Sequence, residues 1–356
     1  MDTDGYDDAN RAFLQAFMAR SSMTLEDAQP ILAAILSTHE HRTIDPEDIT
    51  QEHLTSYISS ANTAISPFDF EIRSTLRQTQ PDPSSSSPNA AAANDTPPPE
   101  RVYALVNTTS DPITQLSTTY SADEIAFVKR ILDFMFDTNN TRLCEGMAIS
   151  SIQAIQQAKV SAADHRSQNP ATQATQGGAA QSLSMTQAEN MMRHLVDEGW
   201  LEKSRAGIFS LTPRALMELR GWLILTYNDD QQEEGGGSRR AGRIKFCAAC
   251  KDIVTVGQRC GERDCKGRLH DHCVRNFFRM QQAEKCPVCK QDWPGDKFVG
   301  ERAIAASNRR QSRNVTSNSN ASAIANAPRG SASLSSPALG GMDGADEEEE
   351  DSMEEE

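Results

Sequence analysis

The chain of 356 residues lacks the features of a membrane or exported protein. No apolar run approaches the ~20 residues that a membrane-spanning helix needs. The N-terminus, MDTDGYDD, is acidic, whereas a secretory signal is basic and then apolar. We therefore expect a soluble, intracellular protein whose cysteines meet a reducing environment.

Cysteine is almost absent from most of the chain, because seven of the eight cysteines lie between Cys247 and Cys289. In a reducing compartment, close-set cysteines are more often metal ligands than disulfides, and an odd number in the cluster also disfavours a disulfide framework. The remaining cysteine, Cys144, has Arg142 as its only basic neighbour in sequence and no histidine nearby. We interpret Cys144 as an inert side chain, not as a nucleophile.

Basic residues are missing from residues 343–356, which carry ten of the chain's acidic residues. The net charge of −15 becomes −5 without this tail, and it divides into −12 over residues 1–160 and +5 over residues 243–302. An acidic N-terminal region is a poor polyanion binder. The tail is predicted to be solvated and unpaired. The alternative is that it binds a basic protein surface such as that of histones.

Four stretches are too polar or too rich in Pro, Ser and Gly to bury a core. These stretches are residues 80–100, 162–183, 229–240 and everything after about Ala303. We interpret the first two as insertions and the third as a linker. The predicted domains are therefore residues 1–120, 121–228 and 243–302, with a linker at 229–242 and a disordered tail at 303–356.

Helical periodicity dominates the first half of the chain, and a pair of strands follows. Thr24 can cap a second helix, although Pro30 should kink or restart it, and Asp45 with Pro46 predicts the start of a third. The predicted helices are residues 8–20, 24 onward and 45–60, and the predicted strands are residues 68–72 and 102–106.

The second half repeats this order. Thr212 and Pro213 are expected to cap a last helix that runs through Leu225. The preceding helices are predicted at residues 123–136, 150–157 and 185–198, with a hairpin formed by residues 200–201 and 208–211. Three helices and a hairpin, twice over, indicate an α+β multidomain protein with tandem winged-helix domains.

Winged helices use their third helix to read DNA, or they dock proteins. The third helix of the second predicted domain carries Arg193 and His194 against three acidic residues, Glu189, Asp197 and Glu198. This balance favours protein docking and leaves direct DNA contact open.

The cysteine-rich module, residues 243–302, has the spacing C-x2-C-x9-C-x4-C-x4-H-x2-C-x12-C-x2-C. Seven thiols and one imidazole fill two tetrahedral zinc sites, and a module of ~45 residues with few core positions needs metal to fold. His270 is the expected histidine ligand, because His272 adjoins Cys273 and would strain a chelate. The predicted ligands are Cys247, Cys250, Cys260, Cys265, His270, Cys273, Cys286 and Cys289.

This ligand order resembles that of the cross-braced zinc modules, the RING finger and the PHD finger. The resemblance implies that Cys247, Cys250, His270 and Cys273 share one ion, and that Cys260, Cys265, Cys286 and Cys289 share the other. A PHD finger usually has an aromatic residue where this chain has Glu284, whereas the Cys-Pro-Val-Cys segment at 286–289 is RING-like. Trp293 is expected to pack beside the second site.

With the segments VYALVN at 102–107, GWLEK at 199–203 and CPVCKQDWP at 286–294, the chain resembles the non-SMC element one family of the Smc five/six complex. The resemblance implies a ubiquitin ligase in DNA repair and recombination, nuclear and chromosomal, that depends on a MAGE-family partner. A kleisin would connect the pair to the Smc heads. Such a ligase orients a ubiquitin-loaded conjugating enzyme and supplies no acid, base or nucleophile of its own.

By the same resemblance, the conjugating enzyme would dock on Ala249, the Phe277 and Phe278 region, and Pro287, with Lys290 after the last cysteine. Ala249 is small where an isoleucine-like side chain is usual, and Lys290 cannot make the planar bidentate contact of arginine. Both departures predict weak activity without a partner. A non-catalytic RING-like brace for assembly and, third, a PHD-type chromatin reader remain alternatives.

Overall fold

The structure is a computed structural model, and it describes residues 6–79, 99–109, 113, 116, 119–160, 181–228 and 242–309. In these residues, no helix is both long enough and apolar enough to cross a membrane. The predicted insertions and linker lie almost wholly outside the described residues, and the acidic tail lies entirely outside them.

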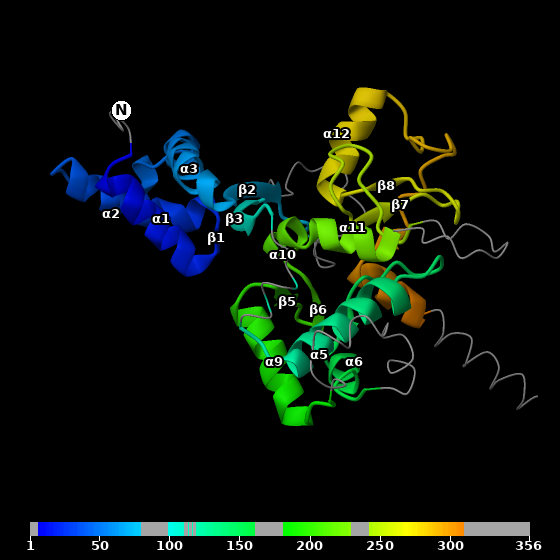
Figure 1. The fold of residues 1–356 in the computed structure, drawn as a ribbon. Helices are drawn as coiled ribbons and strands as arrows, with labels where there is room; N and C mark the ends of the chain where they lie inside the picture. The colour runs from blue at the N-terminus through cyan, green and yellow to red at the C-terminus, as the bar shows by residue number, and fades with distance from the viewer. Residues whose placement is uncertain are drawn as a thin grey trace, which may run out of the picture. The chain divides into compact units, whose positions relative to one another are not determined.

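The N-terminal domain, residues 6–109, packs three helices against a small antiparallel sheet (Figure 1). Thr24 caps α2 in a capping box: its Oγ1 accepts from Asp27 N at 3.2 Å, and its own N–H donates to the Asp27 carboxylate at 3.0 Å. Phe13 and Phe17 of α1 are fully buried at 0% exposure and form the domain's own core with α2 and α3. The elements are α1 (Asp8–Arg20), β1 (Ser22–Met23), α2 (Leu25–His39), η1 (Pro46–Asp48), α3 (Gln51–Ile65), η2 (Ser66–Phe68), β2 (Phe70–Leu76) and β3 (Arg101–Asn107), with sheet order β1-β3-β2.

Two helix boundaries of this domain differ from the prediction. Asp45 and Pro46 start only the 3₁₀ turn η1, because Ile49 turns its extended backbone inward and is buried. Thr50 then caps α3, and its N–H donates to His53 Nδ1 at 3.1 Å. The predicted restart at Pro30 is also wrong, because α2 continues through it as one helix.

The middle domain, residues 119–228, repeats the order helix, short strand, two helices and two strands. Its predicted last helix divides at Leu219 into α10 and α11. The short strands β1 and β4, which complete the sheets of the two domains, were not predicted. The elements are α5 (Ala122–Asp133), the π-helical turn η5 (Phe134–Thr138), β4 (Ile149–Ser150), α6 (Ser151–Gln156), α9 (Met185–Asp197), β5 (Leu201–Lys203), β6 (Ile208–Leu211), α10 (Pro213–Glu218) and α11 (Arg220–Asn228), with sheet order β4-β6-β5.

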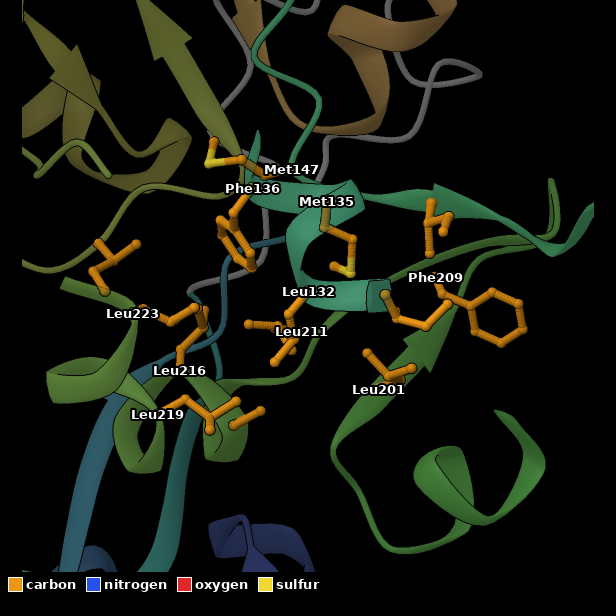
Figure 2. Packing of buried hydrophobic residues seen from close by; sticks show 14 of the residues in the cluster. Leu132, Met135, Phe136, Met147, Leu201, Phe209, Leu211, Leu216, Leu219 and Leu223 are labelled. Atoms are coloured by element: carbon orange, nitrogen blue, oxygen red, sulfur yellow. The ribbon is translucent and has the colours of Figure 1, made fainter. Parts of the chain in front are cut away.

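The core of the middle domain is shared with the cysteine-rich module. In Figure 2, Leu132 of α5 and Phe136 of η5 lie near Leu211 of β6. Leu219, between α10 and α11, and Leu223 of α11 belong to the same cluster. The same cluster of buried residues continues into the module through Ile244, Ile253 and Leu269. Ile113, Leu116 and Tyr120 also belong to it, so the middle domain's core begins before the predicted boundary at residue 120.

The cysteine-rich module has one small sheet and one helix of its own. A further helical segment, residues 301–309, follows it, so the expectation of an unfolded chain after about Ala303 is wrong for these residues. Gly300 N donates to Glu145 O at 2.8 Å, which attaches the start of this segment to the middle domain. The elements are β7 (Gly257–Arg259), β8 (Arg268–Leu269), α12 (Asp271–Gln281) and β9 (Phe298–Val299), with sheet order β8-β7-β9.

Candidate metal centres

The structure gathers the predicted ligands into two groups, within each of which all ligand atoms lie within 4.8 Å of one another. The groups alternate along the chain, as the resemblance to cross-braced modules implies. Among the described residues, His272 and Cys144 belong to neither group. Centre one contains Cys247, Cys250, His270 and Cys273, and centre two contains Cys260, Cys265, Cys286 and Cys289.

Each Cys-x2-Cys pair forms the same tight turn. Lys251 N donates to Cys247 O at 3.0 Å, and Lys290 N donates to Cys286 O at 3.1 Å. Both lysines have left-handed backbone, with φ of 68° and 63°. The turn places the two sulfurs of a pair on the same side of the chain, so each pair supplies half of a tetrahedral ligand set.

His270 is oriented for metal ligation through Nδ1. The ring is 2% exposed, and Nδ1 lies 3.2 Å from Cys250 Sγ and 3.9 Å from Cys273 Sγ. Nε2 lies 3.1 Å from Ile253 O; because a carbonyl can only accept, Nε2 carries the proton. This contact leaves the Nδ1 lone pair for an ion, the usual arrangement around a metal-bound histidine.

Centre two has the dimensions of a tetrahedral thiolate site. Cys260 Sγ lies 3.4 Å from Cys289 Sγ, and Cys265 Sγ lies 3.5 Å from Cys286 Sγ. These distances are near the ~3.8 Å edge of a tetrahedron with ~2.3 Å zinc–sulfur bonds. Gly267 allows the close approach, because a Cβ there would lie 2.5 Å from Cys286 Sγ.

The crowded thiols favour a cation electrostatically. In centre one, hydrogen bonding from Cys250 and Cys273 lowers the pKa of Cys247, whereas hydrogen bonding with Cys247 raises the pKa of Cys273. In centre two, burial raises the pKa of Cys260 to about 12. The thiols of one group therefore cannot all ionise by themselves, and a divalent ion would supply the compensating charge. The residues fit zinc.

The residues predicted to dock a conjugating enzyme are not equally accessible. Ala249 and Lys290 are exposed, and Phe277 and Pro287 are partly buried. Phe278 is wrong as a docking residue, because it is 8% exposed and its ring packs against Trp293 with centroids 5.6 Å apart.

Trp293 is a packing residue beside centre two, as predicted. Its side chain is buried, and Nε1 donates to Gln258 Oε1 at 2.9 Å. Val288 and Met280, which were not among the predicted docking residues, are 55% and 83% exposed. The position of Val288 inside the Cys-Pro-Val-Cys turn was the available signal, since the residue between two ligands faces outward.

A buried ion group fastens the module to the middle domain. Arg268, 1% exposed, donates from Nε to Glu145 Oε2 at 2.7 Å, and Arg259 Nη1 lies 3.3 Å from Glu145 Oε1. Burial is the main cause of the lowered pKa of Arg259, and Glu145 opposes it. More than a hundred residues separate Glu145 from its partners, so no local pattern could reveal this group.

Comparisons with known proteins agree with this architecture. The model of a family described as the Nse1 non-SMC component of the SMC5-6 complex matches residues 10–219, and a RING-like domain model matches residues 247–289. The "Non-structural maintenance of chromosomes element 1 homolog" of Homo sapiens is 22% identical over 289 residues, covering 81% of this chain and 84% of the relative. Element 1 of Schizosaccharomyces pombe is 22% identical over 194 residues, covering 54% and 65%.

A solved structure of an "Nse1-Nse3-Nse4 complex" shares the fold, with a TM-score of 0.56 at 19% identity. It covers 83% of this chain and 99% of the matched chain. The family model spans more than half of the sequence, which confirms the resemblance to the non-SMC element one family. The chain therefore belongs to the family of Nse1 non-SMC components of the SMC5-6 complex, and it carries a RING-like domain.

Proposed function

We propose that this protein is a RING-type ubiquitin ligase subunit that orients a ubiquitin-loaded conjugating enzyme. The observation that carries the proposal is the pair of interleaved four-ligand groups, each with a tight turn that presents exposed residues. The mechanism needs no nucleophile, because holding the thioester in a reactive orientation accelerates transfer by proximity. Cys144 is no substitute nucleophile, since burial raises the pKa of its thiol.

Zn²⁺ is the proposed ion in both centres. Thiolate and imidazole donors in closed tetrahedral sets suit zinc, and structural zinc sites contribute directly to folding. The purified protein should contain two zinc ions per chain. Fewer than two ions would overturn the ligand assignment, whatever the activity.

The proposed docking surface for the conjugating enzyme comprises Ala249, Phe277, Pro287 and Lys290, with Val288 added from the structure. Lys290 Nζ donates to Pro287 O at 3.0 Å, so this lysine is held against its own turn. The small Ala249 and the tethered Lys290 both predict weak activity without a partner.

The proposed partners follow from the family. The matched solved structure is of an Nse1-Nse3-Nse4 complex, which supports a MAGE-type Nse3 and a kleisin-type Nse4 as partners of this chain near the SMC heads. The proposed setting is DNA repair and recombination on chromosomes in the nucleus. The repeated order of helices and strands supports two winged-helix domains, for which we propose protein docking.

A ubiquitin-chain assay with and without the MAGE-type partner tests the ligase. Val288→Arg should abolish partner-dependent chains while two zinc ions are retained, because this exposed side chain does not support the core. Met18→Arg, at a residue 58% exposed on α1, is a matched control that introduces the same charge outside the module. No partner-dependent chains from the wild type across a panel of conjugating enzymes would refute the ligase.

Lys290→Arg tests the docking geometry by gain of function. Arginine keeps the charge and adds a planar fork that can make two parallel contacts. We expect chain formation to rise several-fold at unchanged zinc content. An equal or lower rate would remove this residue from the docking surface.

The second candidate function is a non-catalytic brace for assembly. The small Ala249 and the tethered Lys290 are the observations that favour it. In that case the wild type and Val288→Arg would assemble equally well with partners, and neither would form chains. A PHD-type chromatin reader ranks third, because exposed Glu284 occupies the position of the usual aromatic residue.

A further inference from the structure

One backbone carbonyl near centre one accepts two side-chain hydrogen bonds, one from the cysteine-rich module and one from the N-terminal domain. Ile253 O lies 3.1 Å from His270 Nε2, and it accepts from Gln78 Nε2 at 2.8 Å. His270 belongs to the ligand group of centre one, whereas Gln78 follows strand β2 of the N-terminal domain. A residue 175 positions away in sequence thus shares an acceptor with a metal-ligand side chain.

The Gln78 amide also holds the segment that follows this carbonyl. Gln78 Oε1 accepts from Thr255 N at 2.9 Å, from Val256 N at 3.0 Å and from Thr255 Oγ1 at 3.1 Å. Ile253, Thr255 and Val256 are all less than 9% exposed. Buried backbone groups need hydrogen-bond partners, and the Gln78 side chain bonds to three of them, Ile253 O, Thr255 N and Val256 N.

The held segment is connected directly to the first ligand turn. Cys247 N donates to Asp252 O at 2.8 Å, and Val254 N donates to Lys245 O at 3.0 Å. Residues 245–254 therefore form a closed backbone loop around Cys247 and Cys250. A side chain that fixes residues 253–256 also fixes the position of these two ligands relative to His270.

We propose that Gln78 is a positioning residue of centre one, through which the N-terminal domain orients the His270 ring and the first ligand turn. The inference rests on the proposed metal function, since it assigns Gln78 a role toward the ion of centre one. It also gives the N-terminal domain a part in placing Ala249, which lies within the held turn. Among the described residues, the Gln78 side chain bonds to Ile253, Thr255 and Val256, none of which is a ligand of centre two.

The test is site-resolved metal release from the full chain loaded with Co²⁺. The two centres are distinguishable, because a site of three thiolates and one imidazole absorbs differently from a site of four thiolates. Gln78→Ala should accelerate chelator-driven release from centre one by about 3–10-fold. This is below the roughly 10–100-fold loss of metal affinity on changing a residue that bonds directly to a ligand, because Gln78 acts through Ile253 O. Release from centre two should keep its wild-type rate.

Gln78→Glu isolates the donated hydrogen bond. The carboxylate retains acceptors for Thr255 and Val256 but has no N–H for Ile253 O, so release from centre one should still accelerate. Arg73→Ala is the matched control: Arg73 lies in the same strand β2 and pairs with Glu71 of that strand, so both release rates should stay unchanged.

The outcomes separate the two proposals. A wild type that binds fewer than two ions contradicts the metal function itself. A wild type that binds two ions, with centre-one release equal in wild type, Gln78→Ala and Gln78→Glu, overturns the role of Gln78 alone. Equal acceleration at both centres would show general loosening of the module, and it would also overturn the inference.

Discussion

The N-terminal domain and the cysteine-rich module contact the rest of the chain in different ways. The module shares one apolar core with the middle domain, and the buried Glu145–Arg268 pair, with side chains 7% and 1% exposed, lies between them. The N-terminal domain has a separate core, and its strands β2 and β3 contact α10 of the middle domain. Arg77 and Glu202, whose side chains are 36% and 40% exposed, pair between the same two domains. Sequence distance does not separate these cases, because both attachments bridge more than a hundred residues.

The difference predicts which parts unfold together. A shared apolar core makes two segments cooperative, whereas a domain with its own core can open while its neighbours stay folded, and an exposed ion pair such as Arg77–Glu202 adds at most about 1 kcal/mol. We therefore expect the middle domain and the module to lose structure together and the N-terminal domain to unfold by itself.

Cys286→Ser should remove the ion of centre two and unfold the cysteine-rich module. Structural zinc contributes roughly 10–16 kcal/mol in small zinc modules, which exceeds what so small a module can otherwise supply. Hydrogen exchange should accelerate in residues 242–300 and, through the shared core, in α10 and α11. Residues 6–79 should keep their protection.

Cys144→Ser is the matched control for this variant. Cys144 lies outside both ligand groups, so zinc content and exchange should match the wild type. If the N-terminal domain lost protection in Cys286→Ser to the same extent as α10 and α11, the proposed separation of the two cores would be wrong.

Glu145→Ala should destabilise the middle domain and the module by about 3–5 kcal/mol, because it leaves two buried arginines without their carboxylate. Urea denaturation monitored by tryptophan fluorescence measures this, since Trp200 and Trp293 are buried in the shared core. Arg142→Ala, at a side chain 72% exposed, should change stability by less than about 1 kcal/mol. Equal effects of the two substitutions would contradict a buried ionic attachment.

Gly146→Ala should cost about 1–3 kcal/mol by overpacking. A Cβ at Gly146 would lie 2.8 Å from Ile304 Cγ1, where the helical segment 301–309 meets the middle domain. Ile304→Ala in the same chain removes the obstructing side chain and should recover part of the loss. A double-mutant cycle by thermal denaturation measures the coupling, and strict additivity would show that this contact is not formed.

The ligand groups could be predicted from the sequence, whereas the attachments between domains could not. The two cysteines of a Cys-x2-Cys pair lie in one turn of the chain, so the spacing alone predicts that both sulfurs can bind the same ion. The choice of His270 over His272 likewise depends only on the spacing to Cys273. Phe278 was misassigned because both phenylalanines of α12 look equivalent in sequence, and only packing against Trp293 separates them. Gln78 and Glu145 have no local signature at all, since their partners are set by tertiary packing.

Helix starts also divide into those that the local sequence predicts and those that tertiary packing decides. Thr24 was predicted as a cap, and this local signal is confirmed by its capping box with Asp27. Asp45 with Pro46 is as good a local signal, yet burial of Ile49 shortens that helix to one turn and moves the start of α3 to Gln51. Tertiary burial overrides capping where the two conflict.

Thr24→Ala should cost about 1 kcal/mol, and only in the N-terminal domain. The substitution removes the Oγ1 acceptor of Asp27 N at the start of α2. Thr38→Ala is the matched control in the same helix, because Thr38 is exposed and its Oγ1 donates back to Ala34 O, a contact that adds little to a helix interior. Hydrogen exchange should accelerate in residues 6–79 for Thr24→Ala and stay at the wild-type rate in residues 242–300. Acceleration in both regions would show that the contacts of β2 and β3 with α10, together with those of Arg77 and Gln78, couple the two cores strongly. This smallest change is therefore the most sensitive test of their independence.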